Sequence, residues 1–183
     1  MKIDNLEIQN PLALGPMAGV TDLPFRLLCK EQGCGILYSE MVSAKAILYN
    51  NKKTKDLLAI DEDEHPIGIQ LFGSDPDIMA EIAGRVSYGA CDFIDINMGC
   101  PVPKIVNNHE GSYLLTQPKL VEEILTKMVK ESIKPITIKI RKGFKMANLQ
   151  KLQKLVVYPP LQSMGVQGNN TTVEKLTGMQ SNR

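Results

Sequence analysis

FIDINMGCP, residues Phe93–Pro101, begins as an apolar strand and ends in Gly-Cys-Pro. Asp95 and Asn97 alternate with isoleucines in it, as expected where the two faces of a strand differ. Glycine frees the backbone before Cys100, and proline restricts the backbone after it. The pattern therefore places Cys100 on a turn at a strand end, where a thiol can act as nucleophile or proton donor. Because most free cysteines are inert core residues, composition alone favours a structural role for it.

Other short apolar runs lie on both sides of this strand. They predict strands at residues 12–15, 35–40, 67–73 and 136–143. Helical patterns between them cover residues 25–32, 74–89 and 116–129. This alternation is typical of a parallel sheet with helices outside it. A doubly wound sheet and a (β/α) barrel both fit the pattern.

The second and third helices carry start signals. Ser74 is the predicted N-cap of the second, with Pro76 in its first turn. The third is expected to begin near Thr116, with Pro118 in its first turn. Each then shows an apolar stripe at helical spacing.

Parallel α/β folds place their chemistry where strands end. Pro16, Met17 and Ala18 follow the first predicted strand, within GPMAGVTD. This segment lacks the G-x-G-x-x-G spacing of a dinucleotide loop, but it lets the backbone approach a flat ring. Gln70 and Lys139 lie inside strands, where a buried amide or ammonium is costly unless it is paired. The pattern leaves open whether Lys139 contacts an anion or cofactor or is instead solvent-facing or ion-paired, and Asp95 is a candidate structural partner.

Composition excludes several classes of protein. The chain has 183 residues, 43% of them hydrophobic, and no apolar run approaches the roughly 18–20 residues that cross a bilayer. The N-terminus MKIDNLEIQN is mixed and polar, so we expect a cytoplasmic protein that is not bound to a membrane. The four cysteines form no C-x-x-C pair and only two histidines are present, so no metal site is expected. Residues 1–144 carry 16 basic and 19 acidic residues, whereas residues 145–183 carry five basic residues and one acid.

Six segments of the chain together resemble the tRNA-dihydrouridine synthases. They are PMAGVTDLPFR (16–26), SEMVSA (39–44), QLFGSDP (70–76), DINMGCPVPKIV (95–106), GSYLL (111–115) and IKIRKGF (138–144). They occur in the order and spacing of that family, over residues 1 to about 144. The resemblance, rather than the periodicity, favours a TIM (β/α)8-type barrel that is incomplete, with about five of eight strands.

The resemblance also implies an FMN cofactor over the strand ends. Pro16, Met17 and Ala18 would line the flavin ring. Gln70 would bond its polar edge, and Lys139 would reach its N1/O2 side, where a cation stabilises the reduced flavin.

By the same resemblance, the substrate would be a uridine in tRNA. Asn97 would contact the uracil, and Cys100 would be the general acid that gives a proton to C5 after hydride transfer to C6. The base must leave the tRNA stack to reach the flavin. NADPH would reduce the flavin again.

The chain departs from the family pattern in two places. Tyr113 stands where the family usually has a small residue, which predicts crowding beside Cys100. Residues 145–183 lack the family's next motifs, so we expect a partial barrel domain over 1–144 and an irregular, poorly ordered non-family tail over 145–183.

One permitted coding of residues 162–181, read two bases later, gives a peptide that resembles the family's next segment, which predicts a frameshift near residues 145–150. Two alternatives stay open: another flavin barrel oxidoreductase, such as a dihydroorotate dehydrogenase, and a non-enzymatic remnant.

Overall fold

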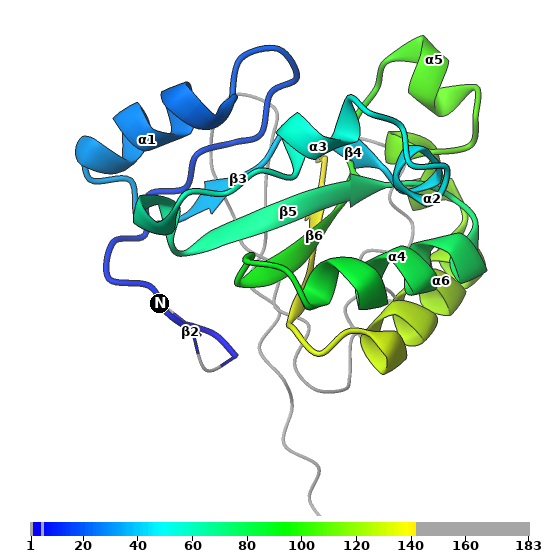
Figure 1. Ribbon diagram of the computed structural model, residues 1–183. Helices are drawn as coiled ribbons and strands as arrows, with labels where there is room; N and C mark the ends of the chain where they lie inside the picture. Colours follow the sequence, from blue (N-terminus) through cyan, green and yellow to red (C-terminus); the bar gives the residue numbers. More distant parts are fainter. Residues whose placement is uncertain (1, 5, 142–183) are drawn as a thin grey trace, which may run out of the picture.

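The computed structural model describes residues 2–4 and 6–141 (Figure 1). The predicted division at residue 144 and the predicted tail and frameshift lie outside these residues. The helices and strands are β1 (Lys2–Ile3), β2 (Leu6–Glu7), α1 (Leu23–Glu31), β3 (Leu37–Tyr38), β4 (Val42–Ser43), α2 (Ala44–Leu48), α3 (Thr54–Leu57), η1 (Glu62–Glu64), β5 (Ile67–Phe72), α4 (Pro76–Ser87), β6 (Phe93–Met98), α5 (Pro103–Val106), η2 (Gly111–Thr116), α6 (Pro118–Glu131) and β7 (Ile136–Ile140). Among these described helices, none is long and apolar enough to cross a membrane.

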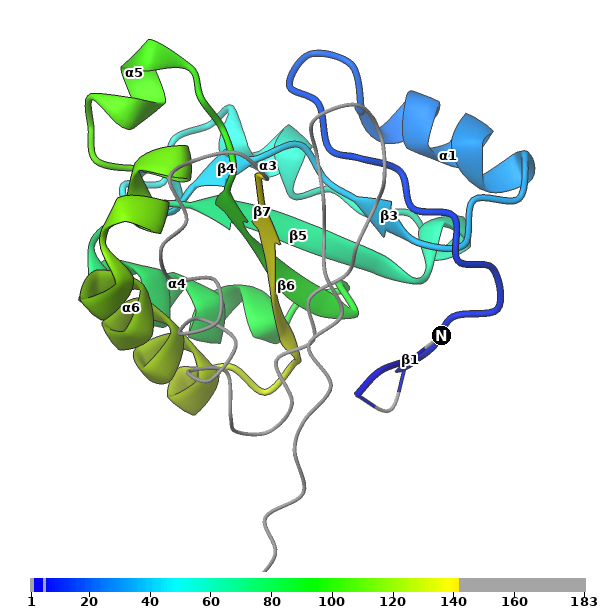
Figure 2. The same ribbon diagram turned by 180° about the vertical axis from the view of Figure 1, so that it is seen from behind.

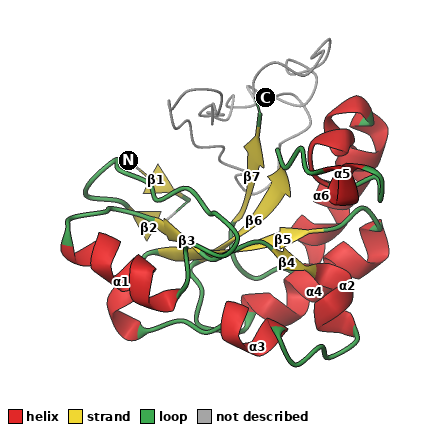
Figure 3. Cartoon of the chain, turned by 90° about the horizontal axis from the view of Figure 1, so that it is seen from above, coloured by secondary structure: helices red, strands yellow, loops and turns green. Residues whose placement is uncertain are grey.

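The main sheet is parallel, with strand order β3-β5-β6-β7 and with β4 also paired to β5. The order follows the chain without reversing, whereas a doubly wound sheet reverses at a switch point. Figure 2 shows β7 beside β6, and Figure 3 shows the sheet curving with α2, α4 and α6 on its outer side. The prediction of an α/β fold with an incomplete barrel is therefore confirmed.

The two faces of the sheet have different chemistry. On the outer face, Ile94, Ile96 and Met98 of β6 belong to a buried apolar cluster with residues of α4 and α6. On the inner face, Phe93 packs edge-on against Tyr38, with ring centroids 5.3 Å apart. Because side chains alternate along a strand, Asp95 and Asn97 share the inner face with Phe93.

The hairpin of β1 and β2 contributes to the apolar end of this inner face. Ile3 and Ile8 are buried in one cluster with Ile36 and the Tyr38–Phe93 pair. The sequence pattern gave no prediction for this hairpin, because each of its strands has only two residues.

The prediction of a strand at residues 12–15 is wrong. Only an isolated parallel bridge joins Ala13 to Ile36, supported by the bond from Leu14 N to Ile36 O. Pro11 and Pro16 flank this short run and cannot donate backbone hydrogen bonds, which limits the ladder. The segment still runs parallel to β3, so its end lies at the edge of the sheet where the other strands finish.

Both predicted helix starts are corrected by one or two residues. The N-cap of α4 is Asp75 rather than Ser74, and its carboxylate accepts from the backbone N–H groups of Asp77 and Ile78. Thr116 ends η2, and α6 begins at Pro118. In both cases proline occupies the first helical position, where its missing N–H costs nothing.

A buried ion pair joins α1 to η1, the short 3-10 helix before β5. Arg26 and Glu64 are both buried, with 2.5 Å between Arg26 Nε and Glu64 Oε1. The guanidinium also donates to the carbonyl oxygens of Thr21 and Ala59. Glu64 accepts as well from the backbone N–H of Asp61. Because every partner is polar and satisfied, the pair fixes the loop that precedes α1 relative to the body of the domain.

Replacing Glu64 by Gln leaves the buried Arg26 charge uncompensated. We expect Glu64→Gln to lower the free energy of unfolding by about 3–5 kcal/mol, as is typical when one partner of a buried pair is removed. Urea denaturation followed by circular dichroism measures this loss. Lys127→Met, which breaks exposed ion pairs of Lys127 to Asp77 and Glu123, is the control and should change stability little. Equal effects of the two substitutions would contradict the role given to Glu64.

Candidate active site

A row of polar side chains crosses the inner face of the sheet. Gln70, Asp95 and Thr137 stand opposite one another on β5, β6 and β7, and all three are buried. The Asp95 carboxylate accepts one bond from Gln70 Nε2 and one from Thr137 Oγ1, each of 2.6 Å. These hydrogen bonds offset the desolvation free energy of burying the three polar side chains. Asp95 is thus a structural partner of Gln70, a possibility that the strand pattern left open.

A second set of bonds leads from this row to the turn that carries Cys100. Gln70 Oε1 accepts from Asn97 Nδ2 at 2.8 Å. Asn97 Oδ1 then accepts from the backbone N–H groups of Gly99 at 3.1 Å and Cys100 at 2.9 Å. Arg141 Nε donates to Gly99 O at 3.0 Å. The turn is therefore held by Gln70 of β5, acting through Asn97, and by Arg141, which directly follows β7. Cys100 is half-buried on this turn.

Gly111 packs directly against this turn. Its backbone has φ of +60°, and a Cβ placed on it would lie 2.7 Å from Cys100 O. The next residue, Ser112, donates its backbone N–H to Cys100 O at 3.0 Å. Tyr113, which was predicted to crowd Cys100, has its ring stacked on His109 with centroids 4.5 Å apart. The close neighbour of the turn is therefore a glycine.

Two ionisable groups on the inner face have shifted pKa values. Burial raises the pKa of Asp95 to about 6, although the bonds from Thr137 and Gln70 and the charge of Lys139 oppose the shift. Desolvation lowers the pKa of Lys139, and the Asp95 charge opposes that shift. Among the residues that the structure describes, the Lys139 ammonium has no hydrogen-bond or ion-pair partner. It is a partly buried cation.

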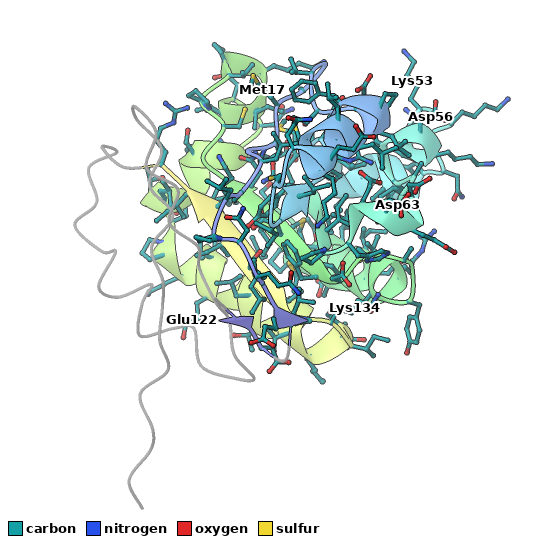
Figure 4. The ribbon with its side chains drawn as sticks, turned by 90° about the vertical axis from the view of Figure 1, so that its left-hand side faces the viewer. Met17, Lys53, Asp56, Asp63, Glu122 and Lys134 are labelled. Atoms are coloured by element: carbon teal, nitrogen blue, oxygen red, sulfur yellow. The ribbon has the colours of Figure 1, made fainter. Side chains whose placement is uncertain are left out.

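The loop of Pro16, Met17 and Ala18 supplies an apolar surface at the same edge of the sheet. Met17 has 58% of its surface exposed, and Figure 4 shows it at the opposite end of the molecule from Lys134, which precedes β7. The loop is nonetheless tied down, since Met17 N donates to Thr21 Oγ1 at 3.0 Å. Gly19 N also donates to the Glu40 carboxylate at 2.8 Å. An exposed apolar surface on a fixed backbone suits a flat ligand.

A cavity of about 520 Å³ lies between the start of α2, the end of β5 and the α5 segment. It is lined by Ser43, Lys45, Phe72, Lys104, Ile105, Asn108 and Glu110. Two lysines and one aromatic side chain are groups that contact nucleic-acid phosphates and bases. Within residues 2–4 and 6–141, no group of three or more His, Cys, Asp or Glu residues could hold a metal ion.

The comparisons with known proteins agree on one family. The model of the dihydrouridine synthase (Dus) family matches residues 12–167. This chain belongs to the dihydrouridine synthase family. The match continues past residue 144, and the predicted domain division there stays a prediction because the described residues end at 141.

Three similar proteins are each named tRNA-dihydrouridine synthase B. The relative from Pseudomonas aeruginosa is 41% identical over 181 residues, which cover 97% of this chain and 54% of the relative. The relative from Pasteurella multocida is 40% identical over 92% of this chain and 51% of its own length. The relative from Escherichia coli K12 is 37% identical over 92% of this chain and 53% of its own length. The chain thus spans about half the length of the curated relatives it matches.

In this dihydrouridine synthase family chain, the predicted site residues gather at one edge of the sheet. Gln70, Asn97 and Lys139 lie on the inner face and Cys100 on the turn above it, while the Pro16–Ala18 loop reaches the same edge from the Ala13 bridge. Sequence reasoning missed Thr137. Its position two residues before Lys139 places it on the same face, and that spacing was the available signal.

Replacing Gly111 by Ala tests how closely this glycine packs on the Cys100 turn. The positive φ and the contact with Cys100 O should together lower the free energy of unfolding by about 1–3 kcal/mol. Gly15→Ala is the matched control, because no atom lies within 4 Å of a Cβ placed there. Urea denaturation of both variants measures the difference, and a neutral Gly111→Ala would contradict the packing described.

Asp95 gives the stability of the fold a defined pH dependence. Its pKa of about 6 in the folded state exceeds the ordinary value of 3.8, so the folded state binds its proton more tightly. The resulting stabilisation is complete below pH 3.8 and is lost as the pH rises through 6. Asp95→Asn should remove this slope, so that the stability difference from wild type changes by about 3 kcal/mol across the window. Urea denaturation at intervals from pH 4 to 7 checks it, and parallel curves would contradict it.

Proposed function

We propose that this chain forms the N-terminal half of a tRNA-dihydrouridine synthase, which reduces uridine in tRNA to 5,6-dihydrouridine. The observation that carries the proposal is the Cys100 turn, which two amide side chains connect to the polar inner face. Family membership supports the reaction class, and the names of the relatives favour tRNA over a free pyrimidine as substrate.

The residues of the site suit an FMN cofactor. A flavin ring presents one apolar end and one polar edge. Apolar contact is available from Met17 and Ala18, with open space beside Gly15. Hydrogen bonding would come from Gln70, whose buried amide already bonds Asp95 and Asn97 and keeps one N–H and one lone pair for a ligand. Charge would come from the Lys139 ammonium, which has no hydrogen-bond or ion-pair partner among the described residues. When bound, FMN would supply the hydride, with NADPH as the source of electrons.

The side chains then have separate roles. Lys139 would hold the negative charge that a reduced flavin carries at its polar edge. Asn97 would contact the uracil, and Cys100 would give its thiol proton to C5 of the pyrimidine as general acid. The braced turn would hold the thiol in one place while the proton moves, which is the role of positioning in catalysis.

The tRNA would deliver an extruded base to this site. Lys45 and Lys104 line the 520 Å³ cavity together with Glu110 and could neutralise phosphates near the target uridine. Local charge is needed there because acids outnumber bases over residues 1–144. Electrostatic attraction for RNA would therefore come from this group rather than from net charge.

The dihydrouridine content of tRNA tests the proposed function. Deleting the gene should remove dihydrouridine at one or more tRNA positions, and re-expressing the gene should restore it. Cys100→Ser should restore it at least about 100-fold more slowly, because general acid catalysis contributes about 10²–10⁴. Cys34→Ser, which changes a half-buried cysteine distant in sequence, is the matched control and should restore dihydrouridine fully. Mass spectrometry of tRNA nucleosides gives the result.

Two outcomes would contradict the proposal. Unchanged dihydrouridine after deletion would favour a non-enzymatic remnant. Loss of free-pyrimidine reduction with normal tRNA would favour another flavin oxidoreductase.

A further inference from the structure

The polar side chains of the inner face form one continuous hydrogen-bond chain. It begins at Thr137 on β7, passes through Asp95 and Asn97 of β6 with Gln70 of β5 between them, and ends at the backbone N–H of Cys100. The side-chain bonds measure 2.6–2.8 Å. Three strands and the thiol turn are thereby connected through side chains alone.

Asp95 sets the direction of the bonds at the buried end of this chain. An ionised carboxylate only accepts, so Gln70 must turn its NH₂ group toward Asp95 and its oxygen toward Asn97. Asn97 must then present its NH₂ group to Gln70, which leaves its oxygen for the backbone N–H groups of Gly99 and Cys100. The backbone donors demand the same orientation from the other end. Both amides are therefore fixed by chemistry rather than by packing alone.

Asp95 and the partly buried Lys139 lie on the same face of neighbouring strands, and the Asp95 charge favours the Lys139 charge. The groups that act on the Lys139 ammonium are Asp95 on β6, Arg141 beyond β7 and the Cys100 thiol. Arg141 disfavours the Lys139 charge, whereas Asp95 favours it. The Asp95 charge also acts on Tyr38 of β3, where it adds to the burial that raises the pKa of the Tyr38 hydroxyl.

We propose that Asp95 is the positioning residue of this site, which orients the Gln70 and Asn97 amides toward the Cys100 turn and places a negative charge on the sheet face that also carries Lys139. The proposal deepens the proposed function and rests on it, because Cys100 and Lys139 are the groups to which that function assigns chemistry. Asp95 touches no reacting atom and acts only through these neighbours.

Hydrogen exchange of the Gly99 and Cys100 amides tests the hydrogen-bond part in the 183-residue chain. Asp95→Leu removes the acceptor of Gln70, so both amides should exchange about fivefold faster or more. Thr137→Val is the matched control, because it removes one donor to Asp95 but leaves the Gln70 bond intact. It should leave both amides within about twofold of wild type. The Ile94 amide, which donates to Pro135 O at 2.9 Å, reports whether the sheet stays folded.

Unchanged exchange of Gly99 and Cys100 in Asp95→Leu, with Ile94 still protected, would overturn the positioning role. If Asp95→Leu unfolds the sheet, Asp95→Asn decides, because asparagine keeps an acceptor for Gln70 and loses only the charge. The Lys139 side-chain NMR signal, assigned with Lys139→Arg, should then titrate at lower pH than in wild type. A purely structural role would leave that titration in place, and an unchanged titration would overturn the electrostatic role.

These readouts need neither flavin nor tRNA. A negative result in them would leave the dihydrouridine measurement unaffected, and a negative dihydrouridine measurement would leave these bonds as observed. The two failures are therefore distinguishable.

Discussion

The buried Asp95 carboxylate is the constraint around which the inner face of this sheet is organised. A charge with 1% of its surface exposed is tolerated only if hydrogen bonds replace water, and Gln70 and Thr137 provide them from the strands on each side. The parallel register that places these residues opposite one another is thus specified by polar groups as well as by the apolar face. Slipping one strand by one residue would leave the carboxylate without its partners.

The two faces of the sheet carry different kinds of side chain. The outer face is aliphatic and packs against the helices, and this contact contains most of the buried apolar side chains. Polar side chains line the inner face toward the carboxyl ends of the strands. Apolar packing continues only at the lower end of the inner face, where Phe93 meets Tyr38 and the N-terminal hairpin. The aliphatic side chains of the outer face therefore contribute mainly to packing, whereas the polar side chains of the inner face, Asp95 among them, contribute both to stability and to the candidate site.

Much of this arrangement could be read from the sequence. The strands at β5, β6 and β7 were apparent because apolar runs end in recognisable turns, and the position of Cys100 followed from Gly99 and Pro101. The sequence could not show that residues 12–15 form only an isolated bridge, since an apolar run does not reveal how many backbone hydrogen bonds it makes to a neighbouring strand. The partner of Gln70 was also hidden, because register across strands is a property of the folded sheet. Arg26 and Glu64 are 38 residues apart, and no local pattern signals that they meet.

The bond from Gly19 to the Glu40 carboxylate has a further consequence for ligand capture. Together with Thr21 and the buried Arg26, it holds the exposed Met17 loop in one shape from both sides. The loop would therefore already have the shape that a planar ring needs, so the loop would lose little conformational entropy when the ring binds. Capture would then be governed by diffusion and orientation, and the lifetime of the complex by the contacts alone.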